Sequence, residues 1–184
     1  DTVTSGIMVY AKTKEAAAFL SREIQENRFD KTYIAAVHGE VFPDKDTLAD
    51  LLFKDSKKNK SFVVKGERKG VKKASLEYEV INRRNGLSLV KIKLHTGRTH
   101  QIRVQFASRK HPVYGDGKYG SAVNLPFIAL QSHEISFIDP EKRKDADERK
   151  KMINLSDFTI LCLPDAASIE AVSFIENENT RIID

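Results

Sequence analysis

The sequence has a single cysteine, no tryptophan and no long apolar run. Cys162 alone cannot form an internal disulfide or a thiolate cluster for zinc or iron–sulfur, and scarce cysteine is typical of the reducing cytoplasm. The longest apolar runs, such as those at residues 7–11 and 158–163, are far shorter than the roughly 20 residues that a membrane-spanning helix needs. The sequence therefore predicts a cytoplasmic protein with neither a disulfide nor a membrane segment.

Motifs of several common enzyme classes are also missing. The chain has no Gly-x-x-x-x-Gly-Lys phosphate loop and no Gly-x-Ser-x-Gly nucleophile turn. His95 and His100 are five residues apart, and no further ligand follows at the spacing of a zinc site. We therefore expect no metal. His100 is either a general base or, more in keeping with its arginine neighbours, a hydrogen-bonded structural residue.

The overall composition is that of a globular domain. The chain has 184 residues, of which 40% are apolar, enough to bury roughly 70% of the surface of the unfolded chain. Neither an internal repeat nor a linker-like composition divides it. We therefore expect a single domain over residues 1–184.

Positive charge is concentrated in one part of the chain. The formal net charge is +5 and the isoelectric point about 9.2. Residues 54–73 hold nine basic and two acidic side chains. A basic loop of this kind attracts a polyphosphate backbone through contacts that release counterions. A solvated, mobile loop without a partner is the alternative.

Apolar and polar residues follow a strand-like pattern in several segments. Residues 6–12, 31–42 and 127–139 predict strands, the first of them buried. Two more strands lie within residues 74–94, joined at an Asn-Gly pair that is a strong hairpin signal. A last strand is expected over residues 158–163.

Helical spacing marks fewer segments. Residues 13–28 predict a helix capped by Thr13, and residues 99–108 and 166–177 predict two more. A short helical segment is expected around Leu48, Leu51 and Leu52, and an exposed charged loop over residues 141–151. The pattern is typical of an α+β domain with a mixed, mainly antiparallel sheet and flanking helices.

The densest group of reactive side chains is HTGRTHQIRVQFASRKHPVYGDGKYG, at residues 95–120. Gly97 precedes Arg98 and Arg103 at the start of the expected helix. A helix N-terminus offers amide donors and partial positive charge, and an arginine fork holds a carboxylate in a fixed orientation. The segment therefore predicts a site for a phosphate or for a carboxylate that must remain ionised.

Four segments together resemble a known family. TGRTHQIR at residues 96–103, followed by HPVYGDGKYG at residues 111–120, closely resembles the hallmark of RluA-type pseudouridine synthases. DTVTSG at residues 1–6 is similar to the end of that family's active-site loop. KTYIAAVHGEV at residues 31–41 is similar to its segment with an active-site tyrosine.

The resemblance implies a pseudouridine synthase catalytic domain with a central active-site cleft. It also implies that the chain starts at the catalytic aspartate. The N-terminal part of the domain, an arginine that enters the RNA stack and any S4-type RNA-binding domain would then lie upstream. Lys110 and Gln131 depart from the family, which usually has glycine and histidine at these positions.

The resemblance further implies isomerisation of uridine to pseudouridine in RNA without a cofactor or metal. Asp1 would attack the ribose or take a proton from its carbon 2, and Arg103 would keep that carboxylate ionised. Tyr33 would stack on the flipped uracil. Ile102 would help to line the pocket, although its helical spacing fits the core equally well. Four basic side chains would hold the RNA backbone: Arg98, Lys69, Lys72 and Lys73.

The expected substrate is large-subunit ribosomal RNA, with transfer RNA as the second candidate, and the expected state is a monomer. A noncatalytic RNA-binding module that uses the same basic residues is the alternative hypothesis. A hydrolase that releases uracil through Asp1 and His100 is a third.

Overall fold

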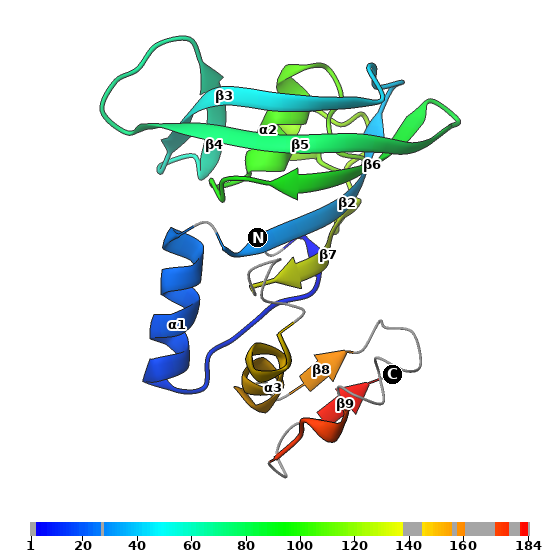
Figure 1. The fold of residues 1–184 in the computed structure, drawn as a ribbon. Coiled ribbons are helices and arrows are strands. Elements are labelled where there is room, and N and C mark those ends of the chain that lie inside the picture. Colours follow the sequence, from blue (N-terminus) through cyan, green and yellow to red (C-terminus); the bar gives the residue numbers. More distant parts are fainter. Residues whose placement is uncertain are drawn as a thin grey trace. The chain divides into compact units, whose positions relative to one another are not determined.

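The computed structural model describes residues 3–26, 28–137, 145–155, 158–160, 172–176 and 181–183. Its elements follow one another along the chain (Figure 1) as β1 (Ser5–Gly6), α1 (Lys14–Gln25), β2 (Asp30–His38), β3 (Lys45–Asp55), β4 (Lys60–Val64), β5 (Val71–Arg84), β6 (Leu87–Leu94), α2 (Gln101–Ser108), the short 3-10 helix η1 (Gly117–Tyr119), β7 (Leu130–Ser136), α3 (Ala146–Leu155), β8 (Phe158–Ile160) and β9 (Arg181–Ile183). They belong to two compact units. The single domain expected from composition stays a prediction.

The first unit contains a seven-stranded sheet and comprises the described residues up to Val9 and Asp30–Ser136. Its strand order is β1-β7-β2-β6-β5-β3-β4. β1 runs parallel to β7, and the other neighbouring strands of this sheet are antiparallel. This arrangement confirms the predicted α+β fold with a mixed, mainly antiparallel sheet.

The hairpin predicted from Asn-Gly joins β5 to β6. Asn85 and Gly86 have φ angles of 54° and 71°, and a two-residue turn of the kind that matches strand twist requires both to be positive. Beyond the turn, Tyr78 lies opposite Ile92 and Leu76 opposite Leu94. Their side chains all face the core, as the alternation predicted.

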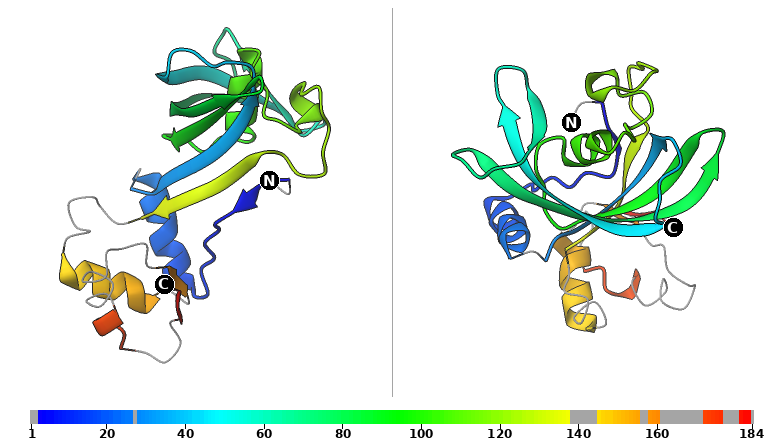
Figure 2. Two further views of the ribbon diagram at one scale, coloured as in Figure 1. Left: turned by 90° about the vertical axis from the view of Figure 1, so that its right-hand side faces the viewer. Right: turned by 90° about the horizontal axis from the view of Figure 1, so that it is seen from above.

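Helix α2 covers one face of this sheet, and the sheet curves around it (Figure 2). Phe106 is 1% exposed, and its ring lies 5.5 Å from that of Tyr78 on β5. Ile102, one turn earlier, is 4% exposed in the same cluster. Isolated helices shorter than about 12 residues are marginal in water. The eight residues of α2 therefore depend on this packing.

The helical segment predicted around Leu48 and Leu52 is wrong, because these residues lie in strand β3. β3 pairs with β5 on one side and β4 on the other. Leu48, Asp50 and Leu52 share one face of the strand, and Asp50 there is bound to the end of α2. Because Asp50 is charged but lies at an inward position, apolar and polar residues do not alternate regularly along this strand. A strand prediction depends on that alternation.

Two other predictions fail in part. Of the first expected strand, residues 6–12, only Gly6 pairs with β7, next to Ser5, and after the Ile7 amide bonds to the Ser132 carbonyl the chain leaves the ladder. Met8 is accordingly 71% exposed rather than buried. The charged stretch expected as a loop over residues 141–151 includes the start of α3; residues 141–144 lie outside the described residues.

The second unit comprises Tyr10–Phe29 and the described residues from Phe137 onward. The Thr13 hydroxyl accepts a hydrogen bond from the Ala16 amide at 3.1 Å, which confirms the predicted cap of α1. In the same unit the ring of Phe137 packs against Phe19 and Phe29. β8 confirms the start of the strand expected at residues 158–163, whereas most of the helix expected at residues 166–177 lies outside the described residues.

Candidate active site

The turn into α2 is built by polar residues of the hallmark segment. The Gln101 side-chain oxygen accepts hydrogen bonds from the Thr96 hydroxyl at 2.8 Å and the Arg98 amide at 3.0 Å. The Gln101 amide nitrogen donates to the Ser75 carbonyl on β5 at 3.0 Å. Thr96 and Gln101 thus fold the segment onto the sheet and fix where α2 begins.

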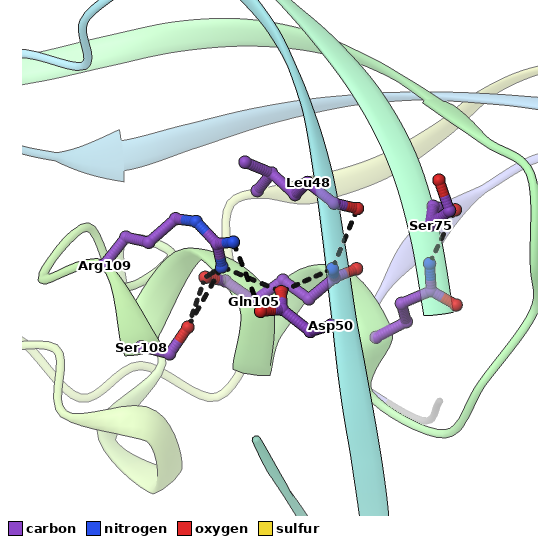
Figure 3. Close-up of polar contacts among 7 residues, drawn as sticks. Leu48, Asp50, Ser75, Gln105, Ser108 and Arg109 are labelled. Atoms are coloured by element: carbon purple, nitrogen blue, oxygen red, sulfur yellow. Dashed lines mark hydrogen bonds and ion pairs between the residues drawn. The ribbon is translucent and has the colours of Figure 1, made fainter. Parts of the chain in front are cut away.

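The other end of α2 is tied to β3 (Figure 3). The side chain of Gln105 donates to the Leu48 carbonyl at 3.2 Å and to the Asp50 carboxylate at 2.7 Å. Arg109 donates to both Asp50 oxygens, at 2.8 and 3.2 Å. With polar ties at both ends and an apolar face between them, α2 has a defined position on the sheet.

Arg103 lies in the first turn of α2 and is buried. Its Nε and Nη2 donate to the two oxygens of Asp116 at 2.6 and 2.7 Å, and the two side chains are 5% and 1% exposed. The Tyr119 ring lies 5.0 Å from the guanidinium carbon. Because the side chain is buried and paired, Arg103 is not a surface contact for an RNA phosphate.

His100 directly precedes α2 and has a left-handed backbone, with φ of 54°. Its Nδ1 lies 2.9 Å from the hydroxyl oxygen of Tyr119, which also accepts the Ser61 amide proton at 2.9 Å. Burial, with the positive charges of Arg103 and Lys118, lowers the pKa of His100 to about 4. The ring is therefore neutral at neutral pH, as a structural hydrogen-bonding histidine requires.

The loop that carries Asp116 is fastened to β2. The His111 Nδ1 lies 2.8 Å from the His38 carbonyl, and the Tyr114 amide donates to the Ala36 carbonyl at 2.8 Å. Gly115 has a φ of 86°, which favours glycine. Asp116 follows at the start of η1, so the loop delivers a carboxylate to the buried side of α2.

Tyr33 is half-buried on β2 and packs against the main core cluster. It lies opposite Ile92 on one side and Ser132 of β7 on the other. Burial raises the pKa of its hydroxyl above the usual value for tyrosine. Tyr33 therefore has a neutral hydroxyl on the face of the sheet that α2 covers.

The basic segment is two strand connections rather than one loop. Residues 54–73 run from the end of β3 through β4 into β5, with turns at residues 56–59 and 65–70. Lys72 precedes the buried Ala74 by two residues, so its side chain leaves β5 on the face that carries α2. Lys73 leaves on the opposite face, with its ammonium 3.6 Å from Glu67.

The structure brings some of the predicted site residues together. The Arg98 Nε donates to the Lys73 carbonyl at 2.9 Å, and Lys69 is exposed in the neighbouring turn. Ile102 lies beside Arg103 in the sequence but is buried in the core, so its part in a pocket stays a prediction. Asp1 lies outside the described residues.

Two residues of this cluster were not predicted from the sequence to act in the site. Both belong to the hallmark segment at residues 111–120. An aspartate between two glycines is also ordinary turn chemistry, and an aromatic side chain is ordinary core, so the sequence did not reveal their role. Only the fold shows that both contact Arg103.

Two kinds of feature are absent from the part of the chain that the structure describes. It contains no group of three or more His, Cys, Asp or Glu side chains that could hold a metal ion. Nor does any of its helices have the length and apolar character that crossing a membrane requires.

The family of this chain follows from its similarity to known proteins. Residues 1–108 match the family model described as RNA pseudouridylate synthase. The match spans more than half of the chain, which therefore belongs to this family, and the resemblance to RluA-type enzymes is confirmed.

Related proteins carry names from the same family. An uncharacterized RNA pseudouridine synthase of Aquifex aeolicus is 43% identical over 77% of this chain and 48% of that protein. The dual-specificity RNA pseudouridine synthase RluA of Yersinia pestis is 39% identical over 77% of this chain and 69% of that protein. The ribosomal large subunit pseudouridine synthase C of Buchnera aphidicola is 33% identical over 79% and 49%, respectively. The chain spans about half the length of most of the curated relatives that it matches.

A solved structure shares the fold. Human RNA pseudouridylate synthase domain containing 1 superposes with a TM-score of 0.61 over 71% of this chain and 58% of that one, at 23% identity. This likeness supports the assignment of the sheet and α2 to the pseudouridine synthase fold.

Proposed function

We propose that this protein isomerises specific uridines to pseudouridine in structured RNA. The observation that carries the proposal is the buried Arg103 on α2, held by the hallmark segment of a chain that belongs to the pseudouridylate synthase family. A buried guanidinium is a preorganised positive charge, and such a charge stabilises a carboxylate that must stay ionised when RNA excludes water.

The reaction conserves every atom of the substrate. The bond between N1 of uracil and C1′ of the ribose breaks, the base turns, and C5 forms a new bond to C1′. The proton that leaves C5 is balanced by a proton gained at N1, so the isomerisation consumes no cofactor. Asp1 is the carboxylate in this proposal, either as nucleophile at C1′ or as base at C2′.

Tyr33 receives the uracil once it has left the RNA stack. Flipping a base costs a few kcal/mol, which a flat aromatic surface partly recovers by stacking. The Tyr33 hydroxyl keeps its proton, because burial raises its pKa. A neutral hydroxyl at the base can guide the proton that departs from C5.

The RNA backbone lies against the basic turns at the end of the sheet. Lys69 and Lys72 are exposed there, and Arg98 is exposed beside them. Such contacts supply affinity rather than sequence choice. Lys73 reaches the same backbone only if the RNA wraps around the edge of the sheet, because its side chain leaves the other face.

We propose large-subunit ribosomal RNA as the substrate, acted on in the cytoplasm by a monomer. Support for the substrate is that the Buchnera relative is named a ribosomal large subunit pseudouridine synthase. The Yersinia relative is named as dual in specificity, which keeps a second RNA class as an outcome of the test.

The decisive experiment compares the intact protein with its Asp1→Asn variant. Each is incubated with total cellular RNA, which is then treated with carbodiimide and mapped by reverse transcription. We expect stops with the wild-type protein alone, at a position that names the RNA. The variant is expected to bind RNA with unchanged affinity, because Asp1 is not among the phosphate contacts.

Other results point to other functions. Stops of equal strength with both proteins would show that Asp1 is not the reacting carboxylate. No stops with either, together with tight and salt-sensitive RNA binding, would favour the noncatalytic RNA-binding module. Release of uracil would lower the mass of the RNA, whereas isomerisation leaves it unchanged, so mass spectrometry separates the hydrolase from the isomerase.

A further inference from the structure

The ion pair between Arg103 and Asp116 is shielded from solvent to an unusual degree for this molecule. The two side chains are 5% and 1% exposed, whereas the pair of Lys45 and Glu79 on the same sheet has 71% and 51% exposed. Removing two charges from water is costly, and an apolar pair of the same volume is often as stable. The buried ion pair is therefore better explained by a function of its charges than by stability alone.

We infer that Asp116 is a positioning residue, which orients the guanidinium of Arg103 for the reacting carboxylate. This inference rests on the proposed function and goes beyond it, because it assigns a role to a carboxylate that does not itself touch the substrate.

The geometry of the pair fixes the plane of the guanidinium. Asp116 accepts from Nε at 2.6 Å and from Nη2 at 2.7 Å, so both of its oxygens hold one edge of the arginine fork. Two parallel hydrogen bonds prevent rotation of the guanidinium, whereas a single hydrogen bond would allow it. The Tyr119 ring lies 5.0 Å from the guanidinium carbon and limits its movement out of the plane.

The backbone of Asp116 is itself fixed by hydrogen bonds of its amide and its carbonyl. Its amide donates to the Val113 carbonyl at 3.0 Å, and its carbonyl accepts from the Tyr119 and Ser121 amides at 3.1 and 3.0 Å. At Gly117, a β-carbon would lie 2.6 Å from the side-chain oxygen of Asn124. The carboxylate therefore projects from a backbone with little room to shift.

Tyr119 links this pair to the basic turns. Its hydroxyl accepts the Ser61 amide proton from β4 and lies 2.9 Å from the His100 ring. The Lys60 ammonium lies 5.0 Å from the Tyr119 ring centre. The support of Arg103 thus comes from β4, α2 and η1 together, and a charge held in this way needs no reorganisation when the substrate arrives.

The arrangement separates catalysis from affinity. Asp116 takes one edge of the Arg103 fork, so that arginine does not offer this edge to an RNA phosphate. Binding then depends on the exposed lysines. Loss of Asp116 should slow the chemical step and leave RNA binding nearly unchanged, a division that general loss of structure does not produce.

The test is a double-mutant cycle in the intact protein, on the RNA fragment in which mapping locates the pseudouridine. Asp116→Asn, Arg103→Gln and the double variant are compared by single-turnover rate at saturating RNA and by Kd. We expect Asp116→Asn to be about 100-fold slower, the loss that a misplacement of about 1 Å produces, with Kd nearly unchanged. The double variant should be no slower than Arg103→Gln alone, because Asp116 acts through Arg103.

Asp50→Asn is the matched control. It also removes a carboxylate that is bound to an arginine, but that arginine is Arg109, which caps the opposite end of α2 (Figure 3). We expect it to retain most of the wild-type rate. If Asp50→Asn and Asp116→Asn slow the reaction equally, Asp116 serves only to hold the helix, and the inference is overturned.

Asp116→Glu covers the case in which the asparagine variant does not fold. The glutamate keeps the charge of the pair but lengthens the side chain by one methylene, which moves the guanidinium. A folded Asp116→Glu variant, verified by circular dichroism, should still be slower than the wild-type protein. A wild-type rate in that folded variant would overturn the inference.

The remaining outcomes separate this inference from the proposed function. An active wild-type protein with an equally active Asp116→Asn variant overturns the role of Asp116 alone. Additive losses in the cycle do the same, because the two residues would then act independently. A wild-type protein that forms no pseudouridine in cellular RNA overturns the proposed function, and the role of Asp116 with it.

Discussion

Among single residues, His100 has the clearest link between its surroundings and a measurable property. Its pKa falls from 6.5 to about 4 in the folded protein, first because the ring is buried and then because Arg103 and Lys118 are close. The unfolded chain therefore binds a proton more readily than the folded one between these values. The free energy of unfolding should fall as pH is lowered from about 6.5 toward 4.

We predict that His100→Gln weakens this pH dependence. Glutamine can still hydrogen-bond the Tyr119 hydroxyl but does not titrate, so the loss of Tm on acidification should be smaller than in the wild-type protein. Thermal unfolding at several pH values between 7 and 4 measures it. His133→Gln, at an exposed position of β7, is the control. Equal slopes for the wild-type and His100→Gln proteins would rule out the depressed pKa.

Arg103 and Asp116 differ in how far their roles follow from the sequence. Arg103 could be selected from the sequence, because the hallmark segment includes it and an arginine near a helix start has a clear use. The hallmark also includes Asp116, but its role could not be derived, since an aspartate between glycines in a turn looks the same whether its carboxylate points to water or to a buried arginine. The choice depends on a contact across thirteen residues that only the fold creates.

Among the elements of the fold, α2 has little stability of its own but carries residues on which the site depends. Its eight residues are too few for an independent helix, yet they carry Ile102, Arg103 and Phe106. Phe106 is the largest of the fully buried side chains in the described structure. We therefore expect the packing of this one ring to decide whether α2 stays on the sheet.

We predict that Phe106→Ala lowers the free energy of unfolding by about 3–5 kcal/mol, because it removes a buried ring and leaves a cavity beside Tyr78. Urea denaturation followed by circular dichroism measures the change. Ile81→Ala, at a side chain that is 52% exposed on β5, should alter stability by no more than about 0.5 kcal/mol. A loss below about 1 kcal/mol for Phe106→Ala would mean that α2 does not depend on this contact.

Elements with regular patterns were predictable, and those shaped by a tertiary contact were not. The β5–β6 hairpin followed from alternation and Asn-Gly, and α1 from its cap. β3 was mistaken for a helix because Asp50 occupies an inward position, where its charge is compensated by Arg109. The first strand was expected to continue past Gly6 because its residues are apolar. Apolar character alone does not supply a neighbouring strand for the backbone to pair with.

At the scale of the whole molecule, function depends on how charge is distributed over the surface. Residues 54–73 concentrate the basic side chains, and the fold divides them between the two faces of the sheet at its β4 end. Lys72 leaves β5 on the face that carries α2 and Tyr33, and Lys73 leaves on the opposite face beside Glu67. Substitutions of Lys72 and Lys73 can therefore show which face of the sheet the RNA contacts.

The salt dependence of RNA binding distinguishes the two faces. Each lysine–phosphate contact contributes about 0.7 to 0.9 to the slope of log K against log salt. We predict that Lys72→Gln reduces the slope by about this amount, whereas Lys73→Gln, its matched control, leaves it within error. Filter binding from low to moderate salt measures both. An effect confined to Lys73→Gln would place the RNA on the face opposite α2, away from Tyr33 and Arg103. Because no chemistry at those residues could then reach the bound RNA, that result would contradict the proposed site as a whole.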